Sequence, residues 1–207
     1  MARAGPATEP PFRVAYRDRW LLVVDKPTGL ATQPTRSGEA NLYDHVQGEE
    51  DYVALHHRLD RPASGLILLA VHRDANVALA RAFREHQVER EYRAVLYGET
   101  VGGQWCRPLE GKPAHTEVVW MGQGSGMTAV QVRLRTGRHH QIRQHAAMEG
   151  TPVVGDRRYA GEAGRAWPRL ALHAWRLSLV HPVTGAPIQV ESSLPTDLEP
   201  LWVLAGG

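Results

Sequence analysis

The sequence predicts an α+β fold with a mixed, mainly antiparallel sheet, flanking helices and a central cleft. Apolar segments of strand length outnumber segments with helical periodicity. Several of the expected strands are separated by short turns rich in glycine and proline, which is typical of β-hairpins. Strands joined by hairpins, with few helices between them, favour an antiparallel sheet over a parallel one.

Two buried strands are expected in the first half of the chain. Residues 20–24 form an apolar run that stops at Lys26 and Pro27, where proline removes a donor from the sheet. Residues 66–71 form a continuous apolar run and are expected to be a central strand. Residues 33–52, between the two strands, are polar and predict a loop with one short helix.

A helix is expected after the second strand, with Asp74 as its N-cap. Ala75, Leu79, Ala82 and Phe83 fall on one face of this helix. We expect that face to pack against the sheet.

The second half of the chain predicts two hairpins and one more helix. Residues 122–126 are glycine-rich but lack the context of a phosphate-binding loop, so we interpret them as a hairpin turn. The following strand, 128–135, alternates apolar residues with Gln131, Arg133 and Arg135. The remaining expected elements are strands 91–97 and 116–121, a helix over 139–149 closed by Gly150, and a hairpin of strands 175–180 and 188–190.

Composition indicates an ordinary globular protein. The 207 residues are 43% hydrophobic and 22% charged, and no apolar run is long enough to span a bilayer. Residues 1–11 predict a loose tail without an apolar signal segment, so residues 12–207 are expected to form a single domain in the cytoplasm. Cys106 is the single cysteine, which excludes an intramolecular disulfide and a zinc ribbon.

The basic residues are more informative by position than by number. The formal net charge is only +2, and 22 of the 24 Lys and Arg residues are arginine, a bias that a GC-rich genome also produces. Between residues 133 and 145 there are four arginines and three histidines but no acidic residue. This block is either a surface that contacts phosphate or simply a solvated basic face.

Asp60 lies where a charged, turn-forming segment enters the expected central strand. Arg58 and Arg61 flank it, and nearby cations favour the ionised form of a carboxylate. Local pattern alone allows a plainer role, in which Asp60 caps a turn and pairs with an arginine for stability.

The surrounding segment, residues 55–70, resembles the signature of RluA-type RNA pseudouridine synthases. In that family the sequence HRLD is followed by a turn with Ser-Gly and then by an aliphatic strand, as in His57-Arg58-Leu59-Asp60 and the residues after it. Other segments resemble the family's further motifs in the same order: VVDKPTGL at 23–30, REYRA at 90–94, GKPAHT at 111–116, TGRHHQIR at 136–143, PVVGD at 152–156 and LHA at 172–174.

This resemblance covers residues 12–192 and implies an enzyme that converts uridine to pseudouridine in structured tRNA or rRNA. The reaction breaks the C1′–N1 bond, turns the base and rejoins it through C5, so it demands neither cofactor nor metal. Asp60 would be the nucleophile. Attack on C6 of uracil, attack on C1′ and removal of a ribose proton remain open as its chemical step.

The resemblance also implies roles for three further residues. Arg138 would form the ion pair that keeps Asp60 charged, unless it contacts phosphate or is an ordinary surface arginine. Tyr92 would stack on the freed uracil and handle a proton, unless it is simply a core tyrosine of its strand. Arg58 would fill the space that the flipped uridine leaves, unless it pairs with Asp60 or binds phosphate.

RNA contacts are expected from Arg58 and from the other arginines near these motifs: Arg61, Arg133, Arg135 and Arg143. His57 is expected to be a structural hydrogen-bonding residue.

Two positions depart from the family pattern: Arg90 stands where lysine is usual, and Thr151 where histidine is usual. Many relatives also carry an N-terminal S4-type RNA-binding domain, so the chain is expected to belong to the short form without it. Its binding partner would then be structured RNA alone, and the enzyme a monomer. A silent RNA-binding protein and a metal-dependent hydrolase are the competing classes, although the histidines lack metal-site spacing.

Overall fold

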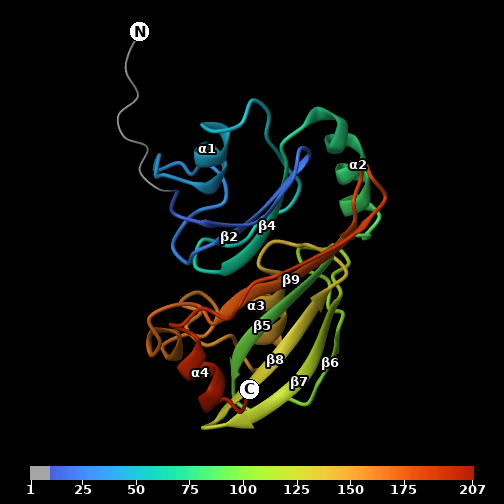
Figure 1. Ribbon diagram of the computed structural model, residues 1–207. Coiled ribbons are helices and arrows are strands. Elements are labelled where there is room, and N and C mark those ends of the chain that lie inside the picture. Colours follow the sequence, from blue (N-terminus) through green and yellow to red (C-terminus); the bar gives the residue numbers. More distant parts are fainter. Residues whose placement is uncertain (1–9) are drawn as a thin grey trace.

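The computed structural model describes residues 10–207 (Figure 1). The tail expected over residues 1–11 therefore lies almost entirely outside the described residues. The described strands form one sheet in the order β1-β2-β4-β9-β5-β8-β7-β6, with β10 paired to β9 and β3 paired to β4. All pairs are antiparallel except β4 with β9, which confirms a mixed, mainly antiparallel sheet.

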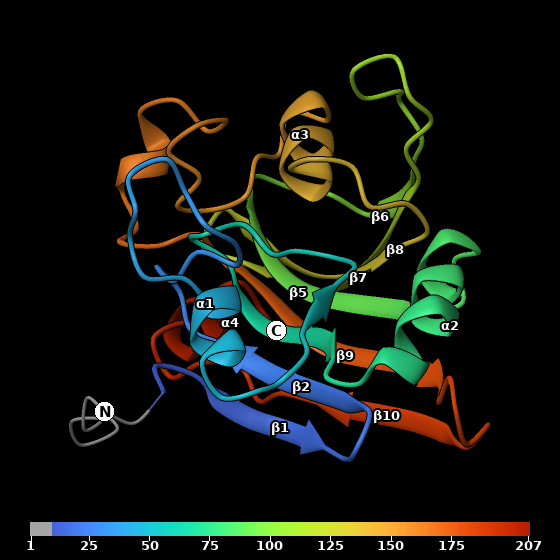
Figure 2. The same ribbon diagram turned by 90° about the horizontal axis from the view of Figure 1, so that it is seen from above.

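The strands are β1 (Arg13–Arg17), β2 (Leu21–Lys26), β3 (Ala54–Leu55), β4 (Ser64–Ala70), β5 (Glu89–Tyr97), β6 (Gly102–Trp105), β7 (Thr116–Gly124), β8 (Met127–Leu134), β9 (Leu172–Val180) and β10 (Pro187–Glu191). The helices are α1 (Leu42–Gln47), α2 (Arg73–Arg84), α3 (Gln141–Met148), α4 (Glu199–Leu204) and the short 3-10 turn η1 (Ala163–Arg165). Seen from above, α1, α2 and α3 lie at three separate places around the strands (Figure 2).

Strand β4 is apolar along its whole length because both of its faces are covered. Leu66 and Leu68 pack in a cluster that includes residues of α2, whereas Ile67 and Leu69 belong to a second cluster that includes residues of α1. All seven residues of β4 are buried. The expectation of a central strand at 66–71 is confirmed, and its continuous apolar run has this two-sided burial as its cause.

Helix α2 packs through the face expected from its spacing, with Ala75 and Leu79 buried. Its first residue is Arg73, however, and its N-cap is His72, whose side chain accepts a hydrogen bond from the amide of Asp74. The prediction of Asp74 as N-cap is therefore wrong by two residues. Asp74 lies instead in the first turn, where its charge is favourable for the helix dipole.

Both expected hairpins are present, as the β7–β8 and β9–β10 pairs. Helix α3 begins at Gln141 rather than at residue 139, because His140 has a φ of 51° in the left-handed region and interrupts the helical backbone. The short strands β1, β3 and β6 and helix α4 were not expected, since each is too short to show a clear period.

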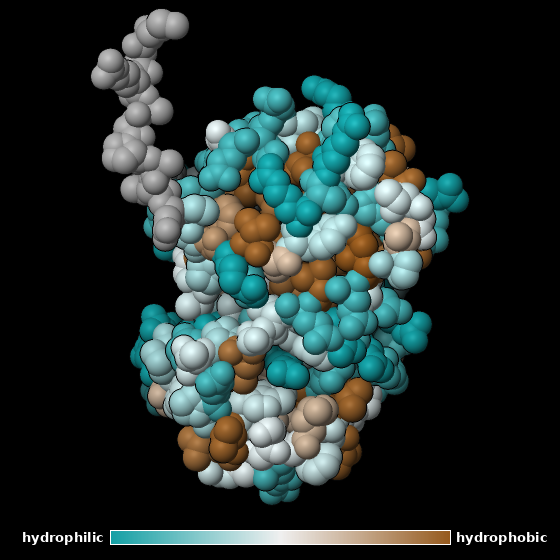
Figure 3. Space-filling view, viewed as in Figure 1, coloured by the Kyte–Doolittle hydropathy of each residue, from teal (hydrophilic) through white to brown (hydrophobic). Residues whose placement is uncertain are grey.

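The surface shows no single dominant apolar region on the face viewed in Figure 1. Brown apolar side chains occur there in several separate groups among teal hydrophilic ones (Figure 3). No helix in residues 10–207 combines the length and the hydropathy needed to cross a membrane.

Gly65 is required where β4 and β9 make their short parallel pairing. It lies opposite Ala174 with a φ of 110°, and a Cβ at this position would overlap the backbone of Ala174. We expect Gly65→Ala to lower the free energy of unfolding by about 3 kcal/mol or more, measured by urea denaturation.

Gly48→Ala is the matched control, because Gly48 has a φ of −70° and a Cβ there would make ordinary contacts at 3.5 and 3.6 Å. Equal stability of the two variants would show that β4 and β9 can separate without cost.

Candidate active site

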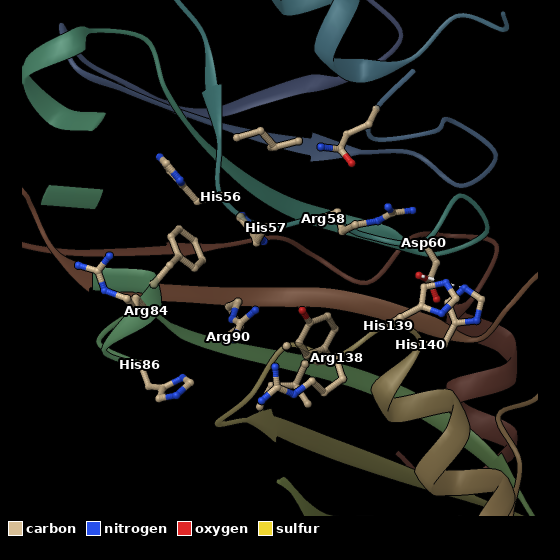
Figure 4. Close-up of a pocket in the computed structure, with 16 residues that line it drawn as sticks. His56, His57, Arg58, Asp60, Arg84, His86, Arg90, Arg138, His139 and His140 are labelled. Carbon is tan, nitrogen blue, oxygen red and sulfur yellow. Dashed lines mark ion pairs between the residues drawn. The ribbon is translucent and has the colours of Figure 1, made fainter. Parts of the chain in front are cut away.

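Asp60 lies in the turn between β3 and β4 and lines a cleft of about 670 Å³. Its side chain is 15% exposed, so it is accessible from the cleft without being solvated on all sides. Figure 4 shows Asp60 with His139 and His140 at one end of this cleft. The other basic side chains that line it are Arg58, Arg84, Arg90, Arg138, His56, His57 and His86.

The turn that carries Asp60 is held by the segment that follows β2. The Thr32 hydroxyl donates to the carbonyl of Leu59 at 2.7 Å and accepts from the Leu59 amide at 3.2 Å. The Lys26 ammonium is fully buried and donates to the carbonyl of Ala63 at 2.7 Å. Burial lowers the pKa of Lys26 to about 7. Hydrogen bonds on both sides of Asp60 therefore fix its backbone relative to β2.

Arg143, from the first turn of α3, is the cation that binds Asp60. Its Nη1 donates to Asp60 Oδ2 at 2.8 Å, while Nε and Nη2 donate to the two oxygens of Asp156 at 2.7 and 2.8 Å. Burial opposes the charge, but the hydrogen bonds with both carboxylates raise the pKa of Arg143. Although burial favours a neutral Asp156, the Arg143 guanidinium lowers the pKa of Asp156 below its ordinary value. One positive charge is thus shared by two carboxylates.

Arg138 does not make the ion pair that the sequence predicted for it. Its Nε donates to the carbonyl of Pro113 at 2.9 Å, and its amide donates to Gln141 Oε1. The left-handed backbone at His140 places Arg138 in the loop before α3, whereas Arg143 lies inside the helix on its buried side. Arg138 still lines the cleft beside Asp60, so its contact with substrate stays a prediction.

His140 and Tyr159 complete the surroundings of Asp60. His140 Nε2 lies 3.5 Å from Asp60 Oδ1, and His140 Nδ1 lies 3.0 Å from the Tyr159 hydroxyl. Burial lowers the pKa of His140 to about 4 despite the attraction of Asp60, so the imidazole is neutral near pH 7. Asp156 accepts from the Tyr159 amide at 3.1 Å, which closes a ring of contacts through Arg143 back to Asp60.

The sequence indicated no role for His140, Tyr159 or Asp156. Asp156 belongs to the motif PVVGD at 152–156, but it acts through its contact with Arg143, which lies 13 residues away along the chain. In the sequence, His139 and His140 are distinguished only as members of the basic block at residues 133–145. Nothing in the local pattern marks Tyr159.

Tyr92 lies on β5 and lines the same cleft as Asp60, together with a smaller cavity of about 60 Å³. Its side chain is buried, with 4% of the residue exposed. Burial raises the pKa of Tyr92, so its hydroxyl stays protonated at neutral pH and can donate a hydrogen bond.

The arginines expected to contact RNA fall into different environments. Arg58 and Arg135 are exposed and form no ion pair within residues 10–207. Arg133 lies 3.6 Å from Glu91 and 4.0 Å from Glu117. Arg61 pairs with Glu39 at 2.6 Å and also donates to the carbonyl of Gly29.

One of these expectations is wrong. Arg143 is 5% exposed and occupied by two carboxylates, so it is not a surface residue that meets phosphate. Arg58 and Arg61 form no ion pair with Asp60 within the described part of the chain, so Arg143 supplies the charge expected from them. The structural role expected for His57 is confirmed, because its Nε2 accepts from the Leu68 amide at 2.8 Å.

The two carboxylates on Arg143 should differ in their effect on stability. The Asp156 side chain is fully buried and makes two bonds to Arg143, whereas Asp60 makes one and is partly exposed. We expect Asp156→Ala to lower the free energy of unfolding by about 3 kcal/mol, because it leaves a buried cation poorly paired. Asp60→Asn should cost about 1 kcal/mol or less. Urea denaturation of both variants measures the difference, and a larger loss for Asp60→Asn would contradict the geometry.

Comparisons with known proteins show the family of the chain. A model of the RNA pseudouridylate synthase family matches residues 20–148. The chain is 34% identical over 206 residues to the dual-specificity RNA pseudouridine synthase RluA of Escherichia coli K12, covering 89% of this chain and 94% of the relative. It is 32% identical to ribosomal large subunit pseudouridine synthase D of Xanthomonas campestris, covering 92% of this chain and 68% of the relative.

The fold has matching solved structures. Human RNA pseudouridylate synthase domain containing 1 superposes with a TM-score of 0.75 at 25% identity, over 96% of this chain and 89% of the human one. Human RNA pseudouridylate synthase domain containing 4 gives a TM-score of 0.74 at 22% identity, which supports the fold. The chain belongs to the RluA-type RNA pseudouridine synthases and is an isomerase that converts uridine to pseudouridine in RNA.

Proposed function

We propose that this enzyme acts on a uridine in structured tRNA or rRNA and that Asp60 is its nucleophile. The observation that carries this proposal is the charge state around Asp60. Arg143 shares its single charge with Asp156, and His140 is neutral near pH 7. The cluster therefore has two carboxyl groups for one guanidinium, and Asp60 is the one that reaches the cleft.

Sharing Arg143 between two carboxylates has a chemical advantage. A carboxylate in an exclusive ion pair with a guanidinium would be strongly stabilised and therefore a weak nucleophile. Asp60 has one short hydrogen bond, at 2.8 Å, and a second contact at 3.5 Å, so its lone pairs are only partly engaged. This arrangement supports an aspartate that is both anionic and able to attack.

Tyr92 offers a surface that can hold the free uracil after the C1′–N1 bond breaks. Tyr92 presents a buried aromatic ring beside Asp60, on which a detached uracil can stack while it turns. The uracil then rejoins the sugar through C5, and the proton from C5 leaves for N1. Reactants and products contain the same atoms and electrons, so no oxidant or group donor is needed.

The RNA class is supported by the relatives. Their names include a dual-specificity RNA pseudouridine synthase and a ribosomal large subunit pseudouridine synthase. A uridine within such folded RNA is stacked, so it must be flipped out to reach Asp60. Arg58 is exposed, unpaired within residues 10–207 and beside Asp60 in the cleft, which suits it to occupy the vacated position.

Loss of the Asp60 carboxylate should abolish conversion while binding survives. RNA from cells with and without the gene is treated with a carbodiimide that marks pseudouridine and mapped by primer extension, after other synthases with the same target have been excluded. We expect at least one site to depend on the gene. Purified Asp60→Asn should form no pseudouridine at that site, with an RNA affinity within a few-fold of the wild type. Activity of this variant would refute the nucleophile assignment.

The role of Arg58 in flipping is tested by varying the stacking of the target. Arg58→Ala should slow conversion of the folded RNA substantially, because flipping a stacked base costs a few kcal/mol. The same variant should slow conversion much less when the target uridine lies in an unstacked single strand. Equal losses on the two substrates would show that Arg58 contributes general binding rather than flipping.

We also propose that residues 12–207 act as one catalytic domain, as a monomer in the cytoplasm and without cofactor. Persistence of activity after treatment with a chelator would eliminate the metal-dependent hydrolase. A silent RNA-binding protein would have no use for the shared Arg143 pair. A dimer in size-exclusion chromatography at working concentration would contradict the monomer.

A further inference from the structure

The cleft is longer than the site of the target nucleoside. Figure 4 shows Arg84 and His86 at the end opposite Asp60, with Arg58, Arg90 and Arg138 between the two ends. All of these side chains line one continuous cavity of about 670 Å³. The chemistry at Asp60 leaves the other end of this cavity, at the end of α2, without an assigned role.

The arginines of this cleft are free of carboxylate partners. Arg58, Arg84, Arg90 and Arg138 form no ion pair within residues 10–207, and the only acidic side chain among the lining residues, Asp60, is already bound by Arg143. Such a surface favours a polyanion.

The adjoining groove has a different charge balance. It has a volume of about 420 Å³ and shares His86, Arg90 and Leu134 with the cleft. Its wall, however, carries three glutamates, and two of them lie within 4.0 Å of Arg133. The unbalanced positive charge therefore ends at His86, which indicates where a bound phosphate chain should stop.

The wall near α2 contains two enclosed donors without partners. The Phe83 ring stacks on His57 at 4.9 Å and lies 5.8 Å from the Arg90 guanidinium carbon. His57 Nε2 accepts from a backbone amide, so the proton of this neutral ring is on Nδ1. Neither His57 Nδ1 nor Arg90 Nε has a hydrogen-bond partner among the described residues. Both atoms are enclosed by protein, so the groups at this end of the cleft that can reach a phosphate are the exposed Arg84 and His86 and the partly exposed Arg90.

His86 adds a backbone observation at the same place. It follows the C-cap of α2 with a φ of 58°, a conformation that helix ends normally reserve for glycine. Its side chain is exposed and lines the cleft.

We propose that Arg84, His86 and Arg90 form a phosphate-binding subsite for the nucleotides on one side of the target uridine. The inference rests on the proposed function, in which the uridine enters at Asp60. The RNA backbone then crosses the cleft past Arg58 and Arg138 and ends its contacts at α2. This subsite anchors the strand while the target base is flipped out.

The test combines Arg84→Ala and His86→Gly, singly and together, with Arg81→Ala as control. Arg81 lies on the same helix, its side chain is 68% exposed, it pairs with Glu85, and it does not line the cleft. His86→Gly removes the imidazole and relaxes the backbone, so weaker binding cannot be attributed to unfolding. The probe is a fluorescent stem-loop RNA carrying the mapped uridine, or unfractionated tRNA if no site is mapped. Its Kd is measured by anisotropy over a range of salt concentrations.

We expect the double variant to bind about tenfold more weakly, with the slope of log Kd against log salt reduced by about one phosphate contact. Arg81→Ala should match the wild type. Shortening the mapped RNA on one side of the uridine should abolish the difference between wild type and double variant, and shortening it on the other side should preserve it.

The subsite is refuted if the double variant and Arg81→Ala have the same Kd and salt slope, or if no truncation abolishes the difference. Failure of the proposed function has a separate signature, the absence of pseudouridine formation by the wild type. In that case the binding measurements with tRNA still decide whether α2 contacts the phosphate backbone.

Discussion

The guanidinium of Arg143 binds Asp60 in the cleft through one nitrogen and Asp156 beneath it through the other two. These three residues come from the turn before β4, from α3 and from the loop after α3, so a single side chain joins three segments of the chain. The sharing also sets the charge of the site. Asp156 takes most of the hydrogen-bonding capacity of Arg143, which leaves Asp60 oriented but incompletely neutralised. For Asp60 as the proposed nucleophile, positioning and reactivity thus come from the same contact.

The other side of Asp60 is held by the backbone. Lys26 and Thr32 attach the turn of Asp60 to the segment after β2, through hydrogen bonds to main-chain groups of Ala63 and Leu59. Just beyond the turn, Gly65 allows β4 to approach β9 closely enough for a parallel pairing. The carboxylate is consequently fixed between two elements that the sheet itself holds in place. A charged group with few degrees of freedom loses little entropy when it meets its substrate.

Basic residues that are neighbours in the sequence make different contacts in the structure. In the block from 133 to 145, Arg143 and His145 point inward, and His145 bonds to Thr116 and to the carbonyl of Arg107. Arg133 is balanced by glutamates. The unpaired arginines that line the cleft come from four different segments, and of these only Arg138 belongs to the block. The proposed phosphate recognition uses this spatial set rather than any run of the sequence.

The sequence by itself determined the class of fold, the long strands, both hairpins, the buried face of α2 and the family. Apolar runs and turn residues determine strands and hairpins through interactions between residues that are close in the sequence. The family is indicated by the HRLD segment and by the order of the other motifs. The placement of Asp60 and Tyr92 in one cleft also agrees with the motif-based expectation. Arg138 shows where such reasoning stops, because it and Arg143 occupy the same motif and both carry the correct charge. Only the tertiary structure shows which of them binds Asp60. On either side of the left-handed residue His140, Arg138 donates to the carbonyl of Pro113, whereas Arg143 is buried between two carboxylates. An ion pair depends on the directions of side chains brought together from distant segments, and those directions are properties of the folded chain.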